Sequence, residues 1–215
     1  MAIHIFLADD HAILREGLRS LLEAYSDLSV VGEAADGRQT VQQAVRLRPD
    51  VVVMDIVMPE LNGIEAARQI RQLSPSTQVV ILSMYAMTEH IARAFQAGVR
   101  GYVLKESVGT ELVDAIRAVY SGHRYLSPQI TDVMLDSTGR LDAEAKNPLE
   151  LLSAREREVL QLVVEGKSSA EIAATLSLST KTVETYRVRL MRKLNLHDLP
   201  SLVRFAIQHG LTPAQ

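Results

Sequence analysis

The sequence contains no cysteine. Disulfides, a cysteine nucleophile, an iron–sulfur cluster and a cysteine-ligated zinc site are therefore excluded. The six histidines form no HExxH motif or close pair, so a histidine-based metal site is not expected. No apolar run approaches the roughly 18–20 residues of a membrane span, and the first residues lack the basic segment of a signal peptide. We therefore expect a cytoplasmic protein with no membrane partner.

The net charge is small, but it is unevenly distributed along the 215 residues. The formal net charge is −3, which by itself argues against a strongly basic nucleic-acid-binding protein. Residues 1–148 hold 14 Lys/Arg against 19 Asp/Glu, whereas residues 149–215 hold 9 against 7. A negative first part and a positive second part indicate two domains with different partners.

The first part alternates short apolar runs with segments of helical periodicity. The runs are nearly continuous in Val, Ile, Leu and Met, which is typical of parallel strands buried on both faces. Five strand–helix units predict an α/β doubly wound (flavodoxin-like) domain over residues 1–122. The predicted strands are residues 3–8, 28–33, 51–54, 79–83 and 101–104.

The rest of the chain has a different pattern. Residues 123–148 are rich in Gly, Ser and Pro breakers and are predicted to be a linker that holds one short helix, with Ile130, Val133, Met134 and Leu135 on its apolar side. Residues 149–215 show four helical segments and no convincing strand. A short helix, a tight turn and a longer basic helix predict a helix-turn-helix at about residues 169–188, within an all-α domain of four helices.

Charged and hydroxyl side chains follow four of the predicted strands. Asp9 and Asp10 come after the first strand, Asp55 after the third, Ser83 ends the fourth and Lys105 follows the fifth. In a parallel sheet these positions share one edge. A lone aspartate at a strand end is usually solvated or caps a helix, but five such residues at one edge favour a site. Clustered carboxylates attract a hard cation such as Mg²⁺, and a carboxylate beside a metal and a lysine suits phosphoryl transfer.

These residues resemble the receiver domain of bacterial two-component response regulators. The matching motifs are Asp9-Asp10, Asp55-Ile-Val-Met58-Pro59, Gly63, Ser83 and Gly101-Tyr102-Val-Leu-Lys105. The resemblance implies that a sensor histidine kinase phosphorylates Asp55, and that Mg²⁺ is held by Asp9, Asp10, Asp55 and the backbone carbonyl of Val57. It also implies that Lys105 contacts the phosphoryl group. Ser83 and Tyr102 would form a switch pair, in which the hydroxyl turns toward the phosphate and the ring follows inward.

The second predicted helix of the helix-turn-helix has one apolar and one polar face. With Val183 at the centre of the apolar face, Leu190 and Leu194 lie within about 20° of it at 100° per residue. Residues 180–194 carry five Lys/Arg against one Glu. A helix that enters the major groove would present the polar face, which holds Lys181, Thr185, Val188 and Arg192. From the charge alone, a face that is merely exposed to solvent is as good an interpretation as a face that contacts DNA.

The second part resembles the LuxR-type helix-turn-helix, on Leu152-Ser-Ala-Arg155-Glu156, Ile172-Ala173, Ser179-Thr-Lys181-Thr182-Val183 and Lys193-Leu194. Both parts together resemble response regulators of the NarL/FixJ class. This implies double-stranded DNA as partner, a homodimer on activation, and a receiver that often masks the DNA-binding helix at rest. Thr182 and Lys193 would touch phosphates, while base edges would face Lys181, Glu184, Thr185 and Val188.

Two further expectations concern packing in the second part. Arg187 lies about 40° from the apolar stripe, so we expect it to pair with Glu156 or Glu158 rather than to contact DNA. The last predicted helix is a candidate dimer seam, although packing within its own domain is an equal alternative. Its apolar residues are Leu199, Leu202, Val203 and Ala206.

Two other functions remain open at this stage. A phosphohydrolase could use Asp55 as nucleophile, but such enzymes usually place a second aspartate two residues later, where this chain has Val57. A constitutive regulator that does not need phosphate is the other alternative, and the complete acidic cluster argues against it. The sequence favours a phosphorylation-controlled transcription factor over an enzyme.

Overall fold

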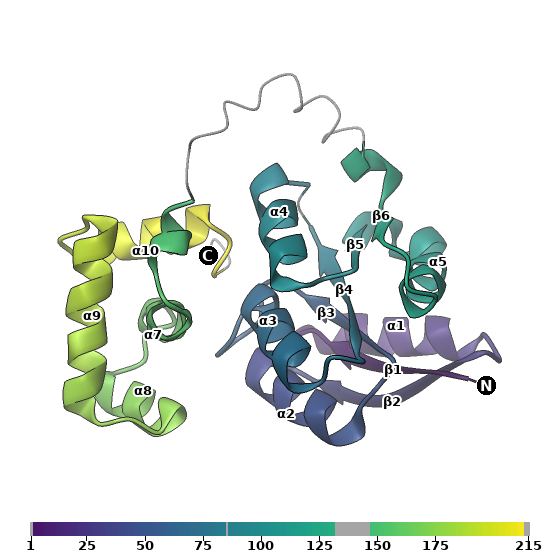
Figure 1. The fold of residues 1–215 in the computed structure, drawn as a ribbon, viewed down its shortest axis with the longest axis horizontal. Coiled ribbons are helices and arrows are strands. Elements are labelled where there is room, and N and C mark those ends of the chain that lie inside the picture. The colour runs from purple at the N-terminus through teal and green to yellow at the C-terminus, as the bar shows by residue number, and fades with distance from the viewer. Residues whose placement is uncertain (1, 85, 132–146, 213–215) are drawn as a thin grey trace. The chain divides into compact units, whose positions relative to one another are not determined.

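The computed structural model describes residues 2–84, 86–131 and 147–212. The chain divides into two compact units, with the boundary between Leu141 and Asp142, and each unit is described separately. The first unit contains a parallel sheet with helices on both faces, and the second is helical (Figure 1). The predicted fold classes of both parts are therefore confirmed.

The sheet has six strands in the order β2-β1-β3-β4-β5-β6, and all neighbours are parallel. The chain starts at β1, moves outward to β2, and then crosses β1 to continue with β3. The strand order therefore reverses between β1 and β3, the position at which such sheets bind ligands. The strands are β1 (Ile3–Ala8), β2 (Leu28–Ala34), β3 (Val51–Asp55), β4 (Gln78–Ser83), β5 (Gly101–Leu104) and β6 (Tyr125–Leu126).

Alternate side chains of the central strands enter two separate cores. In β1, Ile5 and Leu7 pack on one face of the sheet, whereas Phe6 packs on the other, and all three are fully buried. This alternation requires apolar residues at every position, which is why the strands are nearly continuous apolar runs. One core is covered by α1 (Ala12–Glu23) and α5 (Val108–Tyr120), and the other by α2 (Gly37–Leu47), α3 (Gly63–Leu73) and α4 (Thr88–Ala97).

The sixth strand was not predicted, and it lies within the predicted linker. Its two residues pair with β5, and Ser127 then donates its backbone N–H to the Tyr102 carbonyl at 3.1 Å. Residues 128–131 are helical, and Ile130 is fully buried in the core under α2, α3 and α4. The predicted linker thus begins with a segment that packs on the sheet. The other apolar residues of the predicted short helix, Val133, Met134 and Leu135, lie outside the described residues.

The described part of the second unit forms a short η2 turn and four α-helices around one core. Serine caps fix where three of the helices begin. Ser153 and Glu156 form a capping box at the start of α7, and Ser168 forms another with Glu171 at α8. Ser179 accepts from the Thr182 backbone N–H at the start of α9. The elements are η2 (Pro148–Leu151), α7 (Ala154–Val164), α8 (Ser169–Leu176), α9 (Thr180–Leu194) and α10 (Leu199–Gln208).

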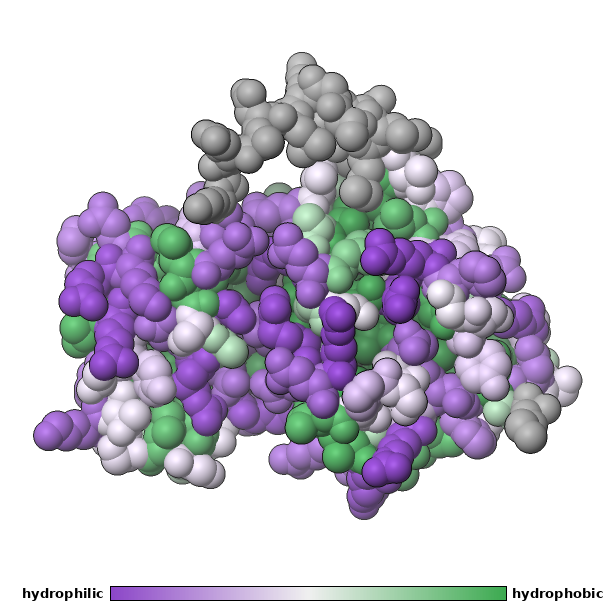
Figure 2. All heavy atoms as spheres, viewed as in Figure 1, coloured by the Kyte–Doolittle hydropathy of each residue, from purple (hydrophilic) through white to green (hydrophobic). Residues whose placement is uncertain are grey.

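The apolar side chains lie mainly in the cores, and the surface is correspondingly polar. Hydrophilic side chains cover much of the face in view, with apolar residues scattered between them (Figure 2). Among the described residues, no helix has both the length and the apolar character needed to cross a bilayer.

Candidate functional site

The carboxyl ends of the central strands bring together the acidic residues predicted from the sequence. Ala8 of β1 lies opposite Met54 of β3 in the sheet register. The next residues, Asp9 and Asp55, therefore emerge side by side at the point where the strand order reverses. Both aspartates are buried: Asp9 is fully buried, and 6% of the surface of Asp55 is exposed.

Lys105 connects the two buried aspartates. It follows β5 as the first residue of the short η1 turn (Lys105–Ser107), and its Nζ lies 2.7 Å from both Asp9 Oδ2 and Asp55 Oδ2. Its side chain is itself only 9% exposed. The ammonium group thus neutralises part of a buried negative cluster that would otherwise be strongly unfavourable.

Burial and charge act in opposite directions on this cluster. Burial raises the pKa of Asp55, against the opposing effect of the Lys105 ammonium. Burial alone would lower the pKa of Lys105, but the two carboxylates outweigh it and raise that pKa. Asp55 is therefore a carboxylate held in a poorly solvated place, next to a lysine that stays protonated.

One further acidic residue and one histidine complete the cluster. Oxygen or nitrogen atoms of Asp9, Asp10, His11 and Asp55 all lie within 4.8 Å of one another. His11 Nδ1 lies 2.8 Å from Asp10 Oδ1 and 3.1 Å from Asp9 Oδ1. The carboxylate set is suited to a hard divalent cation. His11 was not among the predicted site residues, because a single histidine beside two aspartates has no recognisable metal-ligand spacing.

The loop after Asp55 approaches the strand very closely. The Gly63 backbone N–H donates to the Ile56 carbonyl at 2.7 Å, and a Cβ at Gly63 would lie only 2.0 Å from the Asp55 carbonyl oxygen. Any side chain at this position would push α3 away from Asp55. Two other residues fix this loop. Met58 is buried, with 2% of its surface exposed, and the Asn62 side chain accepts from the Glu65 backbone N–H to cap α3.

The predicted switch pair lies in contact inside the fold. Tyr102 is fully buried, and Ser83 at the end of β4 is 2% exposed. The two side chains are hydrogen-bonded to each other, while burial raises the pKa of Tyr102 to about 12. The ring therefore occupies the inward position, with its hydroxyl directed to the serine that ends β4.

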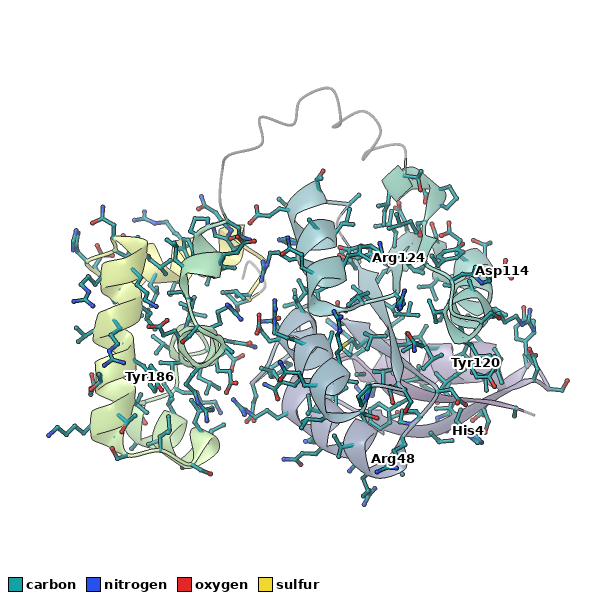
Figure 3. All side chains as sticks on the ribbon, viewed as in Figure 1. His4, Arg48, Asp114, Tyr120, Arg124 and Tyr186 are labelled. Carbon is teal, nitrogen blue, oxygen red and sulfur yellow. The ribbon has the colours of Figure 1, made fainter. Side chains whose placement is uncertain are left out.

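In the second unit, the turn between α8 and α9 has the predicted geometry of a helix-turn-helix. Ser177 ends α8 in the left-handed conformation with φ of 53°, and α9 begins three residues later at Thr180. On α9, Val183 and Leu190 are buried against the core, and Tyr186 (labelled in Figure 3) packs partly against it. The apolar face of α9 is thus fixed to the domain, and its other face is free of the core.

The exposed side of α9 is polar apart from one valine, and is called here the α9 face. Val188 at its centre is 67% exposed. Thr185 Oγ1 donates to the Lys181 carbonyl at 2.9 Å, so this hydroxyl is engaged with its own helix. The face forms a shallow hollow lined by Lys181, Glu184, Thr185, Val188, Arg189 and Arg192. Arg189 was not predicted, because on the helical wheel it lies about 60° from the centre of the polar side.

Hydrogen bonds hold two of the predicted DNA-contacting residues of α9, one through α8 and one through the cap of α9 itself. Ser169 of α8 bonds to the Glu184 carboxylate, and Arg187 donates to the Ser169 hydroxyl at 2.9 Å. Thr182 Oγ1 lies 2.8 Å from the Ser179 hydroxyl. The predicted base-edge residue Glu184 is thus held by α8, and the predicted phosphate contact Thr182 is held by the helix cap.

The predicted partner of Arg187 is wrong. Its Nη1 lies 3.9 Å from Glu184 Oε1, whereas Glu156 pairs with Lys193 at 2.6 Å and Glu158 pairs with Arg155 at 2.8 Å. The first turn of α7 lies near the C-terminal end of α9, so Glu156 meets Lys193 instead of Arg187. The predicted phosphate contact Lys193 therefore already has a carboxylate partner in the free chain.

The predicted dimer seam on α10 is also partly wrong. Leu202 and Ala206 are buried in the core of their own domain, with exposed fractions of 2% and 0%. Leu199 is 48% exposed and Val203 is partly exposed, so only these two residues of the four remain available to a second copy.

The buried Glu156 carboxylate provides a prediction about stability. Burial opposes its ionisation, but Lys193 and the Ser153 backbone N–H and hydroxyl outweigh this effect, so the pKa of Glu156 is lowered below its usual 4.5. The stabilisation is therefore complete above pH 4.5 and is lost as the pH falls through the lower folded-state pKa. We expect Glu156→Gln to cost at most about 1 kcal/mol near neutral pH, because a glutamine Oε1 can still accept from the Ser153 backbone N–H and the lost charge pairs with Lys193, which is 37% exposed.

Hydrogen exchange on the full chain measures this effect. Amides of α7 and α9 should exchange faster in Glu156→Gln, while those of the first unit stay unchanged. Glu171→Gln is the matched control, because Glu171 forms the same kind of capping box but its nearby lysine, Lys167, directly precedes the same helix, so the change should affect α8 alone. Equal protection of α9 in Glu156→Gln and the wild type would contradict the prediction.

Comparison with known proteins gives a consistent result over nearly the whole chain. Residues 5–117 match the response regulator receiver domain, and residues 150–206 match the luxR family of bacterial regulatory proteins. The chain is 37% identical over 212 residues to the oxygen regulatory protein NreC of Staphylococcus carnosus, covering 96% of this chain and 98% of the relative. It is also 37% identical over 214 residues to the response regulator UvrY of Escherichia coli strain K12, with 99% and 97% covered.

Solved structures of one response regulator, RcsB, resemble the chain in both sequence and fold. A complex of RcsB with DNA matches with a TM-score of 0.59 at 27% identity, covering 95% of this chain and 98% of that chain. Another structure holds two RcsB dimers on two parallel DNAs, with a TM-score of 0.61, 27% identity and the same coverage. Relatives and matched domains are regulators of transcription rather than enzymes, which excludes the phosphohydrolase alternative. The chain therefore belongs to the two-component response regulators of the NarL/FixJ class, in which a receiver domain precedes a LuxR-type DNA-binding domain.

Proposed function

We propose that phosphorylation of Asp55 by a sensor histidine kinase controls the binding of this regulator to DNA. The observation that carries the proposal is the position of Asp55, which is a buried carboxylate at the reversal point of the sheet, bonded to Lys105 and adjacent to Asp9. An incoming phosphoryl group would meet a nucleophile, a lysine and a carboxylate cluster in one place. For the chain as a whole, we propose a receiver over residues 1–122, a linker over 123–148 and a DNA-binding domain over 149–215.

We further propose that Mg²⁺ binds at this cluster, held by Asp9, Asp10, Asp55 and the backbone carbonyl of Val57. The close approach of the three carboxylates supports this assignment, because hard oxygen ligands are those that Mg²⁺ prefers. When bound, the cation would offset charge on the phosphoryl oxygens. His11 lies on two of these carboxylates in the free chain, so its ring would have to move aside for the cation.

In this proposal, Lys105 changes partner when Asp55 is phosphorylated. Its ammonium contacts Asp55 in the free chain and would contact a phosphoryl oxygen afterwards, while Asp9 keeps it near the site. Ser83 ends the neighbouring strand, and its hydrogen bond to Tyr102 supports a coupling between the phosphate and that ring. Phosphorylation would then shift the population of receiver conformers rather than create a new one.

The α9 face is the proposed DNA-contacting surface. Lys181, Glu184, Thr185, Val188 and Arg192 lie on one exposed side of a helix whose other side is fixed to the core. Thr182 and Lys193 flank that side and stay proposed phosphate contacts. We propose that the activated protein binds as a homodimer to paired half-sites, as the RcsB dimers on DNA suggest. A regulator of transcription acts where the chromosome is, so we assign it to the cytoplasm.

The experiment that tests the proposal is selection of bound sequences from random double-stranded oligonucleotides. The full chain is used with and without Mg²⁺ and beryllofluoride, which stands in for the phosphoryl group. We expect one paired motif to be enriched, with tighter binding in the presence of beryllofluoride. Equal binding under both conditions would favour the constitutive regulator, and no enrichment would contradict sequence-specific DNA binding.

A further inference from the structure

A second group of charges lies at the opposite edge of the sheet from Asp55. A cavity of about 170 Å³ opens where α3 leads into β4, where α4 leads into β5 and where the chain enters β6. The strands β4, β5 and β6 begin at this edge, whereas Ser83 and Lys105 lie at the carboxyl ends of β4 and β5. The cavity is therefore separate from the proposed phosphorylation site.

Three arginines line this cavity without any acidic residue. They are Arg71 in the last turn of α3, Arg100 before β5 and Arg124 before β6 (labelled in Figure 3). Arg124 lies over the ring of Phe95 at 5.6 Å from its centroid. The remaining lining residues are uncharged: Pro75, Thr77, Gln78, Val79, Phe95, Gly98 and Val99. We call this site the arginine cavity.

The three guanidinium groups differ from several other arginines of the first unit in having no carboxylate partner among the described residues. Among the described residues, none of them forms an ion pair with a carboxylate, whereas Arg19 pairs with Glu33 and Arg117 pairs with Asp27. Like charges gathered around one concave surface repel each other, and an anion that enters the concavity relieves the repulsion.

The backbone does not supply enough negative charge to balance the three arginines. Helices α3 and α4 both end here, and each helix C-terminus contributes the equivalent of about −0.5 elementary charge. Two such ends offset about one of the three positive charges. The arginine cavity keeps a net positive charge of about two, which favours a multiply charged anion over a monovalent one.

We propose that the arginine cavity binds a small, multiply charged anion that bears phosphate groups. Guanidinium groups bind phosphate through paired N–H···O bonds in a fixed planar geometry, so several arginines around one cavity favour phosphate over a monovalent anion. The cavity volume fits a compact anion of the size of pyrophosphate. Such a ligand would bridge the ends of α3 and α4 to the segment before β6, three parts of the chain that are far apart in the sequence.

The test is calorimetric titration of the full chain with inorganic pyrophosphate in the absence of Mg²⁺. We expect saturable binding with one site per chain, weakened at least tenfold in the double variant Arg100→Gln/Arg124→Gln. Arg46→Gln/Arg48→Gln is the matched control, because it removes the same charge from two exposed arginines at the end of α2 outside the cavity. Arg192→Gln tests the other basic surface, the α9 face, and should leave the pyrophosphate affinity unchanged.

The alternative outcomes are distinct. Equal affinity in the wild type and the double variant would overturn the proposal, and so would a loss of binding in Arg192→Gln. Phosphate of the DNA backbone is the other source of the same chemistry. If the wild-type chain does not bind pyrophosphate and the double variant binds DNA more weakly than the wild type, the cavity contacts DNA. That result would overturn a small-anion site. Unchanged phosphorylation of Asp55 in the double variant shows that its receiver is folded and separates this test from the proposed function.

Discussion

Replacing Asp55 by asparagine should abolish phosphorylation of the chain and, with it, the part of DNA binding that depends on phosphorylation. The reaction requires a carboxylate oxygen that attacks phosphorus, while the bond from phosphorus to the donor breaks and an acyl phosphate forms. An amide oxygen at the same place is a much weaker nucleophile and leaves no stable product. We expect the loss to be complete, because no other described carboxylate both contacts Lys105 and lies at the end of β3.

The variant should remain folded, which makes the loss interpretable. Burial raises the pKa of Asp55, so its ionised form is less favourable in the folded than in the unfolded chain. A raised carboxyl pKa means that ionisation destabilises the fold above the folded-state pKa, and that this cost disappears as the pH falls. Asparagine removes the cost at every pH. Lys105 keeps its contact of 2.7 Å with Asp9, so the ammonium does not lose its anionic partner.

Transfer of labelled phosphate from a small acyl phosphate donor measures the first effect, and oligonucleotide binding with and without beryllofluoride measures the second. Asp114→Asn is the matched control, since Asp114 (labelled in Figure 3) is an exposed aspartate on α5 and changes the charge by the same amount. It should be phosphorylated like the wild type. Retention of labelled phosphate in Asp55→Asn would show that another residue is the acceptor.

The sequence was sufficient to predict the parts of the fold that depend on periodic patterns. The predicted strand 3–8 coincides with β1, and the other four differ from the structure by at most one residue at either end. Both cores require apolar residues at successive strand positions, so these strands give a strong local signal. The capping box that begins α7 is equally local, because Ser153 accepts from the Glu156 backbone N–H only three residues later.

The features that were missed depend on contacts between distant segments. Two residues of β6 have no periodicity, and they are placed only by pairing with β5 and by the burial of Ile130. The same reason accounts for the wrong partner of Arg187. A helical wheel gives its direction around α9, but the choice between Glu184 and Glu156 depends on how α7 crosses α9, which no local pattern contains.

The acidic cluster could be predicted as a set but not as a geometry. Chain order places Asp9, Asp55 and Lys105 at one sheet edge, and the structure brings them together. Side-chain packing and charge neutralisation in three dimensions decide the details. They place Lys105 between both carboxylates and bring His11 into contact with Asp10. The DNA-contacting residues remain predictions for the same reason, since their partner is a second molecule.

The α9 face provides the second large expected effect. The double variant Lys181→Ala/Arg192→Ala should weaken DNA binding by at least tenfold and should lower the dependence of affinity on salt. Each lost phosphate contact reduces the slope of log K against log salt by about one, and each lost base contact costs about 1–3 kcal/mol. Both side chains are exposed and have no ion pair among the described residues, so their removal leaves the fold of the domain intact.

The control must remove the same charge elsewhere. Arg46 and Arg48 are exposed at the end of α2 in the first unit, and Arg46→Ala/Arg48→Ala lowers the net charge equally. Fluorescence anisotropy on the selected oligonucleotide, at several salt concentrations, should show an unchanged affinity and slope for this control. Equal losses in both double variants would mean that the total charge, and not the α9 face, determines binding.

Glu184 separates base recognition from attraction to the backbone. Its carboxylate repels phosphates, so an alanine there should not lower the affinity for DNA of random sequence, and the salt slope should stay unchanged. On the selected sequence, a Glu184 carboxylate that accepts from a cytosine amino group would set a preference for cytosine at one position of each half-site. Glu184→Ala should lose that preference, by about 1–3 kcal/mol. The bond from Ser169 holds this carboxylate against α8, so Ser169→Ala should weaken the same preference without removing it. Uniform weakening across all sequences in Glu184→Ala would contradict a role in base recognition and would assign the residue to the structure of the helix-turn-helix.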